Sequence, residues 1–518
     1  MRVIYNALSN GVKKVIDIRI HSSRHLEVKI TYPIPNHSSY KKDIDYYIFS
    51  PPQLNVSANV IKRDAMLRKF QAHARYSSPE ITIDELVDSS NIISPLYLIE
   101  LYAHQLIAGS SKVDDEIVIH EIQTLCNSFR HEASATIQEC KDIMKRGTAQ
   151  EVLSLLYHWG SETREALHRY RGIIEKIDCH YPNGNKICSA FAWGDEAMSL
   201  LVETTHIDLF RLAQAYPLLQ RDTYIFLITY AKDEAQHRKN KNYISVIIPN
   251  SKDNKESRVY RSAELKKWTQ SVLYLQPVES KSPKRIGGIL AGTAAAIAMT
   301  FATLTAIFAE RFFLKNSMQW ALLIILAYVF KDRIKEGLRA FFTRLVPRLF
   351  SDQVFFFYAP RTKRKINKTK VVIRMHGSSK LPTFIQRVRE EGDSPFIDML
   401  PEEDVVHYTR FVKIFQHEKK KALGPWINSI SVVIRLRIDD WLKEMDDSED
   451  YRYVPTDEHE IEIQQESKVY HVHIIITESG DKHKIEDLHH VKLIMNKQGI
   501  IRLEHIESSF VPENAPLH

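Results

Sequence analysis

The longest run without a charged side chain covers residues 286–309 and reads IGGILAGTAAAIAMTFATLTAIFA. At 1.5 Å rise per residue, a helix of these 24 residues is about 36 Å long, which exceeds the hydrocarbon thickness of a bilayer, about 30 Å. A surface helix of a soluble protein shows polar positions every three or four residues, whereas only Thr and Gly interrupt this run. The pattern therefore predicts a membrane-spanning helix rather than a buried core helix.

A second apolar run, 318–330 (MQWALLIILAYVF), has 13 residues without a charge. Extending it to 312 includes Lys315, whose side chain can reach the headgroups, and short spans are accommodated by local thinning of the bilayer. Two arrangements fit: a hairpin of two spanning helices, or one spanning helix followed by a helix in the interface. Lys and Arg number five in 266–285 and six in 331–350, against two in the turn between the runs. Because Lys and Arg accumulate on the cytoplasmic side, we expect the hairpin, with both flanks in the cytoplasm.

The patterns on either side predict an α+β membrane protein, in which a transmembrane helical hairpin separates an N-terminal β-plus-helical-bundle domain from a C-terminal mixed α/β domain. Alternating β-branched and aromatic residues predict strands at 14–20, 26–32 and 44–49, and apolar positions three and four apart predict an antiparallel bundle. The expected bundle helices are 95–109, 113–146, 148–178, 192–216 and 218–239, and a strand is expected at 243–249. The expected regions are a strand-rich part (1–94), a helical bundle (95–250), a linker (251–285), the transmembrane hairpin (286–330), a basic amphipathic juxtamembrane helix (331–350) and a C-terminal α+β domain (351–518).

The C-terminal region is expected to mix both types of element. Strands are predicted at 354–358 and 370–375, followed by helices at 382–391, 401–422 and 427–445. The last strands are predicted at 458–463, 469–477, 491–495 and 500–505.

Composition agrees with water-soluble domains on a short anchor. The 518 residues have a mean hydropathy of −0.29 and a net charge of +7, and the positive charge gathers beside the apolar runs. This distribution favours anionic lipid headgroups and makes nucleic acid an unexpected partner. Candidate headgroup contacts are Lys331, Arg333, Lys335, Arg361, Lys363, Arg364 and Lys365. The N-terminal residues do not resemble a secretory signal, so we expect an integral protein of a plasma or inner membrane with cytoplasmic termini.

Two sets of residues have the types that bind metals. Glu165-x-x-His168 and Glu234-x-x-His237 lie on two predicted bundle helices, as in carboxylate-bridged two-metal sites. The alternative is solvated surface, because Glu165 is about 140° around its helix from the apolar stripe. His471 and His473 alternate onto one face of a predicted strand, but no third ligand has diagnostic spacing. Neither set predicts a metal or other cofactor.

Small residues recur every fourth position in the first apolar run, at Gly288, Gly292 and Ala296. This spacing allows close helix packing, either between copies of the chain or within the hairpin itself. No nucleotide-binding loop, nucleophile elbow, zinc-protease motif or CxxC pair is present.

Three functional classes remain. The first is a membrane-anchored, non-enzymatic scaffold or sensor with both soluble parts in the cytoplasm, which holds a cytoplasmic protein partner or self-assembles through the hairpin. The second is an oligomeric pore gated by the cytoplasmic domains, and the third is a membrane-tethered enzyme. The absence of catalytic motifs and of charge within the first run favours the first class.

Overall fold

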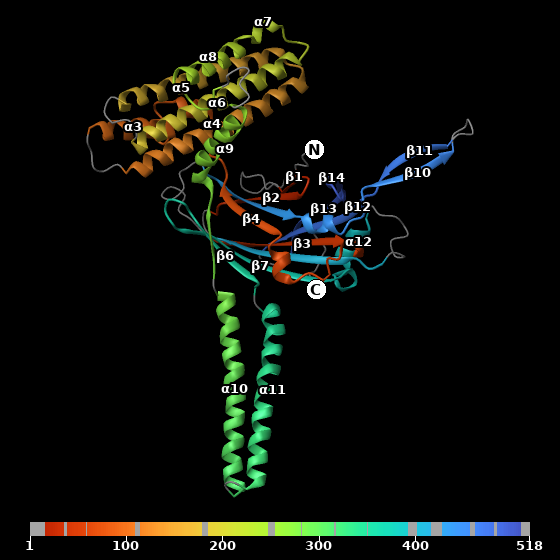
Figure 1. Cartoon of the computed structure of the whole chain (residues 1–518). Coiled ribbons are helices and arrows are strands. Elements are labelled where there is room, and N and C mark those ends of the chain that lie inside the picture. The colour runs from red at the N-terminus through yellow and green to blue at the C-terminus, as the bar shows by residue number, and fades with distance from the viewer. Residues whose placement is uncertain are drawn as a thin grey trace.

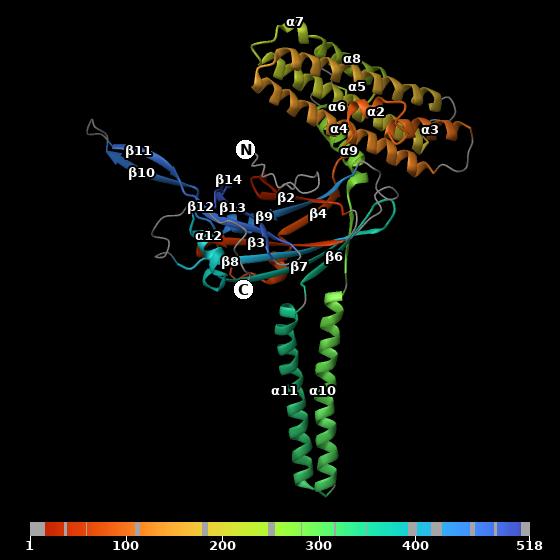
Figure 2. The same ribbon diagram turned by 180° about the vertical axis from the view of Figure 1, so that it is seen from behind.

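The protein combines a helical bundle, a β-sandwich and a long helical hairpin, which points away from the bundle (Figures 1 and 2). It is a mixed structure with 52% helix and 29% strand. The computed structural model describes residues 16–35, 39–57, 60–108, 114–178, 185–246, 254–280, 282–314, 317–349, 351–391, 401–415, 427–455, 461–480 and 484–508.

Two antiparallel sheets stack to form the sandwich. The smaller sheet has the order β1-β2-β9-β4 and the larger has the order β14-β13-β12-β3-β8-β7-β6-β5. The strands of the smaller sheet are β1 (Ile16–Ser22), β2 (His25–Pro33), β9 (Ser429–Arg437) and β4 (Phe70–Tyr76). Those of the larger sheet are β14 (Gly499–Ile506), β13 (Ile485–Asn496), β12 (Tyr470–Ser479), β3 (Tyr40–Ser50), β8 (Asp404–Ile414), β7 (Lys365–Gly377), β6 (Gln353–Tyr358) and β5 (Gln276–Glu279).

Alternation along the strands creates the main core between these sheets. In β2, for example, Leu26, Val28, Ile30 and Tyr32 are all buried in it. The outer face of the larger sheet is covered by the short amphipathic helix α12 (Thr383–Glu390), which buries Ile385 and Val388. The other short helices are α1 (Arg63–Leu67), α2 (Ile83–Val87) and α14 (Asp439–Lys443), with single 3-10 turns at Pro52–Leu54, Ser271–Leu273 and Ser378–Lys380.

The N-terminal and C-terminal strands fold together, which corrects the separate regions expected at 1–94 and 351–518. Strand β3 pairs with both β8 and β12, and β9 lies between β2 and β4. The bundle is thus inserted between β4 and β5, and the hairpin between β5 and β6. These long-range pairings leave no signature in local sequence patterns.

Two predicted helices of the C-terminal region are wrong. Strand β8 occupies much of the helix expected at 401–422, and β9 and α14 replace the helix expected at 427–445. Strand β9 alternates apolar residues, from Ile430 to Leu436, with mostly polar ones, which is the period of a strand and was missed. Strand β8 has His407, Thr409 and Arg410 among its apolar residues, so it shows no clean alternation. The other strands predicted in this region are present, although residues 458–460 lie outside the described residues.

The bundle follows the predicted helices closely. It contains α3 (Pro95–Ile107), α4 (Asp115–Arg146), α5 (Ala149–Asp178), α6 (Lys186–Gln214), α7 (Arg221–Tyr224), α8 (Phe226–Asn240) and α9 (Asn254–Gln270). Helix α6 begins six residues before its predicted start, because the Asn185 side chain accepts a hydrogen bond from the Ile187 amide and caps it. The strand expected at 243–249 is absent from its described part, 243–246, which forms turns.

The hairpin consists of α10 (Ser282–Phe312) and α11 (Met318–Leu349), which pack against each other along their length. Within the described residues, one segment, Gly288–Phe312, is long and apolar enough to cross a membrane, and only 11% of its most apolar window is buried. Helix α11 does not meet that criterion. It continues without a break from the second apolar run into the predicted juxtamembrane helix, so the expected second full span is not supported by its composition.

A two-stranded ribbon projects from the sandwich, at the right in Figure 1. It is formed by β10 (Glu449–Pro455) and β11 (Ile461–Ser467), which pair only with each other. One face of this ribbon carries Tyr451, Tyr453 and Ile463, all of them exposed.

Candidate functional site

The two hairpin helices contact each other through alanines. Ala294, Ala298 and Ala309 of α10 and Ala327 of α11 are at most 5% exposed, and among the described residues the main neighbour of each hairpin helix is the other helix. Small side chains allow the backbones to approach closely, so this alanine seam holds the two helices side by side.

The small residues singled out from the sequence lie elsewhere. Gly288, Gly292 and Ala296 are exposed, and a Cβ added to either glycine would meet no atom within 4 Å. The interpretation that they pack within their own hairpin is therefore wrong. Packing between copies of the chain is not tested by this structure.

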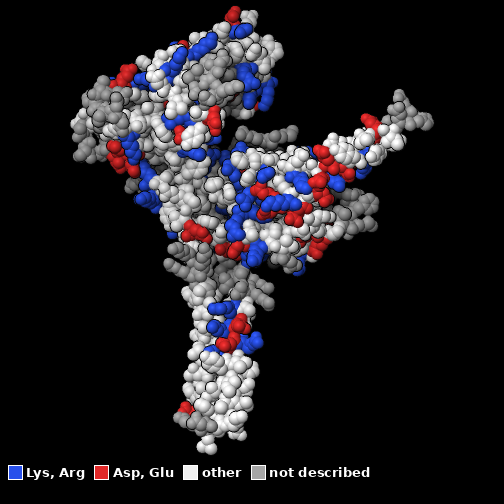
Figure 3. Space-filling view, in the orientation of Figure 1, with Lys and Arg blue, Asp and Glu red and all other residues white. Residues whose placement is uncertain are grey.

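Bulky apolar side chains cover the half of the hairpin that includes its turn, and no other described part of the chain covers them. On α10 they are Met299, Phe301, Leu304, Ile307, Phe308 and Phe312, and on α11 they include Met318, Leu322, Ile325, Leu326, Val329 and Phe330. Their exposed fractions run from 39% to 84%. We call this surface the apolar tip; it forms the white lower part of the stalk in Figure 3. Contiguous apolar surface of this extent is unusual on a soluble protein and marks a contact with lipid or with another protein.

A charged belt follows the apolar tip on α11. It consists of Lys331, Asp332, Arg333, Lys335, Glu336 and Arg339. The belt is visible midway along the stalk in Figure 3. The ammonium group of Lys331 lies 3.6 Å from the ring centroid of Tyr328, so a cation–π contact marks the boundary between the apolar tip and the belt.

The threonines of α10 keep their hydroxyl groups within the helix. Thr293, Thr300, Thr303 and Thr305 each donate to a backbone carbonyl three or four residues earlier, at 2.8 to 3.0 Å. This is how Thr satisfies its hydroxyl in an apolar environment. The hydroxyl donors of these threonines are thus already engaged within the helix and would add little polar lining to a pore.

The second basic group lies away from the hairpin. Arg361, Lys363 and Arg364 are in the turn after β6, at the end of that strand farther from α11, and the Arg361 guanidinium is 3.9 Å from Glu121 of the bundle. Lys365 begins β7 and lies over the Phe356 ring at 4.1 Å. Arg361 therefore reaches the bundle, and this group lies at the opposite end of β6 from α11, which carries Lys331, Arg333 and Lys335.

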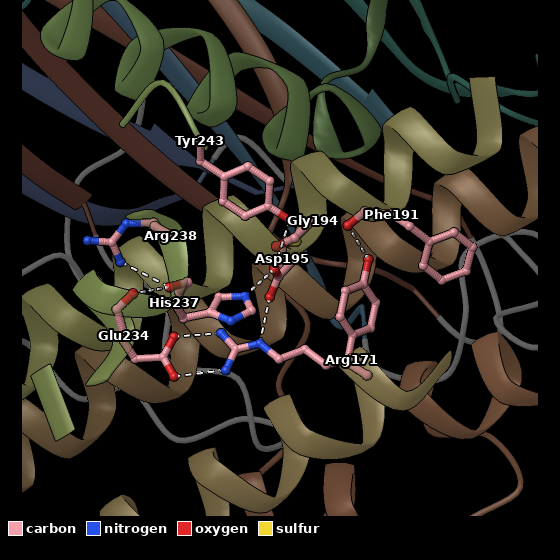
Figure 4. A network of polar contacts seen from close by, with 11 residues as sticks. Arg171, Phe191, Gly194, Asp195, Glu234, His237, Arg238 and Tyr243 are labelled. Atoms are coloured by element: carbon pink, nitrogen blue, oxygen red, sulfur yellow. Dashed lines mark hydrogen bonds and ion pairs between the residues drawn. The ribbon is translucent and has the colours of Figure 1, made fainter. Parts of the chain in front are cut away.

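A buried ion network joins the bundle helices α5, α6 and α8 (Figure 4). Arg171 of α5 donates to Asp195 at 2.9 Å and, through both terminal nitrogens, to Glu234 at 3.0 and 2.6 Å. The other oxygen of Asp195 contacts His237 at 2.7 Å and accepts from Tyr243 at 2.9 Å. The Arg171 guanidinium thus bridges α6 and α8, each of which supplies one carboxylate.

Neighbouring ion pairs extend this network to α9. Arg238 donates to Ser199 at 3.0 Å and to Glu203, while Arg261 of α9 donates to Glu196 at 3.1 and 2.7 Å. The Arg261 guanidinium also lies 4.3 Å from the ring centroid of Trp193. These contacts fix α9, which leads to β5 and the hairpin, against α6.

The negative charge of Asp195 is balanced by the groups that surround it. Burial would raise the pKa of this carboxyl, but the hydrogen bond from His237 and the charge of Arg171 outweigh burial and hold the pKa below its ordinary value. Burial alone dominates for Arg238, whose pKa falls to about 10. Asp195 is therefore an anion that the fold requires.

The proposed bundle metal residues are not brought together. Glu165 and His168 are exposed on α5, and His168 lines a shallow groove with His104, whereas Glu234 and His237 turn inward to the ion network. The expectation of a solvated surface is therefore right for the first two residues and wrong for the last two. Among the described residues, no three His, Cys, Asp or Glu side chains are grouped closely enough to hold a metal ion.

The predicted histidine pair is also rearranged. His471 is exposed, whereas His473 is buried and its Nδ1 lies 3.0 Å from Nε2 of His490 on the next strand. Burial, together with the charge of Arg389, lowers the pKa of His473 to about 2. The two imidazoles of His473 and His490 therefore form a hydrogen-bonded buried contact.

Sequence reasoning missed the ion network, although a signal was present. Asp195 lies between Phe191, Met198 and Val202 at spacings of four, three and four, so it occupies a position on the apolar stripe of α6. A carboxylate at such a position requires a buried cation. Comparison of the chain with protein-family models, curated proteins and solved structures finds no match.

Proposed function

We propose that this protein is a membrane-anchored, non-enzymatic scaffold or sensor whose hairpin inserts into a lipid bilayer. The observation that carries the proposal is the apolar tip, a projecting surface of bulky apolar side chains that no other residue described by the structure covers. A soluble partner is a less suitable cover, since apolar residues surround both helices of the tip and no polar rim divides them.

The sheet supports the expected sidedness. Strand β5 precedes α10, β6 follows α11, and these two strands are hydrogen-bonded neighbours from Gln276↔Tyr358 to Glu279↔Phe355. A single crossing would place neighbouring strands on opposite sides of the membrane. The pairing therefore supports a hairpin that enters and leaves on one side, and the positive-inside rule favours the cytoplasm as that side, in a plasma or inner membrane.

The arrangement suits a scaffold. The sandwich lies at the base of the hairpin and the bundle lies on the far side of the sandwich, so the bundle would be held away from the lipid and open to a cytoplasmic partner (Figure 2). Its ion pairs are structural, and no cleft of the described residues gathers catalytic groups.

Membrane insertion is tested with the full chain and two matched variants. Leu304→Asp with Ile325→Asp changes two tip residues that are 61% and 62% exposed, and Leu218→Asp with Ile244→Asp changes two bundle residues that are 59% and 60% exposed. We expect the unaltered chain and the bundle variant to float with vesicles and to resist carbonate extraction. The tip variant should be extracted. A detergent-free, monodisperse unaltered chain that stays out of the vesicle fraction would contradict the proposal.

A further inference from the structure

The bulky apolar surface ends at the same level on both hairpin helices. On α10 it runs from Met299 to Phe312, and on α11 it runs from Met318 to Phe330. With 1.5 Å per residue, each stretch covers about 20 Å. Because α10 and α11 are antiparallel and joined at the turn, the two stretches lie side by side and define one apolar layer.

Charged residues lie near both ends of this layer. Glu310 and Arg311 lie in the last helical turn of α10, just before Phe312, and the charged belt begins at Lys331 on α11. Above the layer, from Gly288 onward, the exposed face of α10 is built mainly of Gly, Ala and Thr, and Ile289 and Ile297 are the bulky exposed side chains that the structure describes there. The uncharged run of the sequence is thus longer than the surface that strongly favours hydrocarbon.

We infer that the hairpin fits a hydrocarbon layer about 20 Å thick, roughly 10 Å thinner than that of an ordinary bilayer. This inference rests on the proposed membrane insertion. The occupant of the apolar tip is lipid, and the belt lies at the near headgroups, where Lys331 and Tyr328 have the character of interfacial residues. The protein therefore thins the surrounding bilayer or gathers where the bilayer is already thin.

The belt argues against burial in a bilayer of full thickness. With the turn at the far headgroups, such a bilayer would enclose Lys331 to Glu336 in hydrocarbon. Lys and Arg side chains can reach outward to the headgroups, but the shorter Asp332 and Glu336 cannot. The belt carries both signs on an exposed face, so at this depth it would need a cover that the described residues of the chain do not supply.

The experiment compares retention of the full chain in vesicles of different thickness. Phosphatidylcholine with myristoleoyl, oleoyl or erucoyl chains is mixed with one fixed fraction of phosphatidylglycerol, and reconstituted protein is measured by flotation. The cost of mismatch accumulates with each ångström, so we expect at least about tenfold higher retention in myristoleoyl than in erucoyl vesicles.

A variant with leucine at five belt positions, Lys331, Asp332, Arg333, Lys335 and Glu336, extends the apolar stretch of α11 to Leu338, about 30 Å from Met318. We expect its preference to move to the oleoyl or erucoyl vesicles. The matched control, Arg361→Gln with Lys363→Gln and Arg364→Gln, removes basic residues that lie away from the hairpin and should keep the preference for the thin bilayer.

The outcomes separate this inference from the proposed function. Equal retention in all three lipids, or best retention in erucoyl lipid, overturns the thin-layer inference and leaves the anchor intact. Equal retention together with a disulfide between copies at Asp332→Cys also overturns it, because the belt would then be covered by a second copy. No retention in any vesicle would overturn the proposed insertion itself.

Discussion

Replacing Arg171 with methionine should destabilise the bundle strongly, because this guanidinium neutralises two carboxylates at once. The side chain is 22% exposed, whereas Asp195 is 1% and Glu234 is 11% exposed. Removing one member of a fully buried ion pair costs about 3–5 kcal/mol. Since solvent reaches part of Arg171, we expect a loss of about 2–4 kcal/mol, or a melting temperature lower by about 4–16 °C.

A matched control lies two turns earlier on the same helix. Arg164 also pairs with α8, at 3.3 Å from Asp233, but both side chains are more than half exposed. Arg164→Met should change stability by less than about 0.5 kcal/mol. Hydrogen exchange of the full chain in detergent would measure the opening of α5, α6 and α8 directly, which avoids the assumption that the whole protein unfolds in one step.

The pH dependence provides a second readout. In the unaltered protein the pKa of Asp195 is lowered, so its contribution is present at neutral pH and is lost as the pH falls through that lowered value. Without Arg171, burial is less opposed and the pKa of Asp195 rises. The deficit of Arg171→Met should therefore be largest near pH 7 and should shrink on acidification. Equal losses for Arg171→Met and Arg164→Met, or a deficit independent of pH, would refute the assigned role.

Three further predictions concern separate parts of the protein. Gly194→Ala should destabilise α6 by about 1–3 kcal/mol in thermal unfolding, because the new Cβ would lie 2.4 Å from the buried Tyr170 hydroxyl oxygen. The control Gly172→Ala, whose Cβ would meet no atom within 4 Å, should stabilise α5 by about 0.5–1 kcal/mol. Burial lowers the pKa of His206 to about 4, so the free energy of unfolding of the bundle should fall by up to about 3 kcal/mol as the pH falls from about 6.5 to 4. His206→Phe should abolish that loss, and an unchanged acid profile of stability would contradict this. Tyr453→Ser with Ile463→Ser should leave the melting temperature within about 1 °C, because these facing ribbon side chains are 72% and 60% exposed, and a large drop would show that the ribbon packs on the sandwich in solution.

Local sequence patterns were sufficient to predict the helices of the bundle. Its helices have apolar positions at helical spacing, and short connections force neighbouring helices to be antiparallel. The pattern could not say which polar residues were inside. Glu234 and Arg238 are separated from Leu227 and Ala231 by the same three- and four-residue steps as core residues, and treating these acids and bases as surface concealed the ion network.

The sandwich could not be predicted to the same degree, for two physical reasons. Polar residues interrupt the apolar positions of strand β8, so no clean alternation marks it as a strand, although β9 does alternate from Ile430 to Leu436. Its pairings also join residues hundreds of positions apart, as in Ile30↔Val432. Such contacts are fixed by tertiary packing and leave no local pattern.

The hairpin illustrates how a short strand can carry more topological information than a long apolar run. By composition, α10 is suited to crossing a membrane and α11 is not, which taken alone would favour a single span and flanks on opposite sides. Strand β5 contains only four residues, one of them proline, and all four are exposed, so nothing in the sequence identifies it. Its pairing with β6 nevertheless requires both flanks to lie on the same side of any membrane that the hairpin enters. Because α11 must then accompany α10 to the same depth, its charged belt, rather than the length of the uncharged run in α10, limits how thick a hydrocarbon layer the hairpin can occupy.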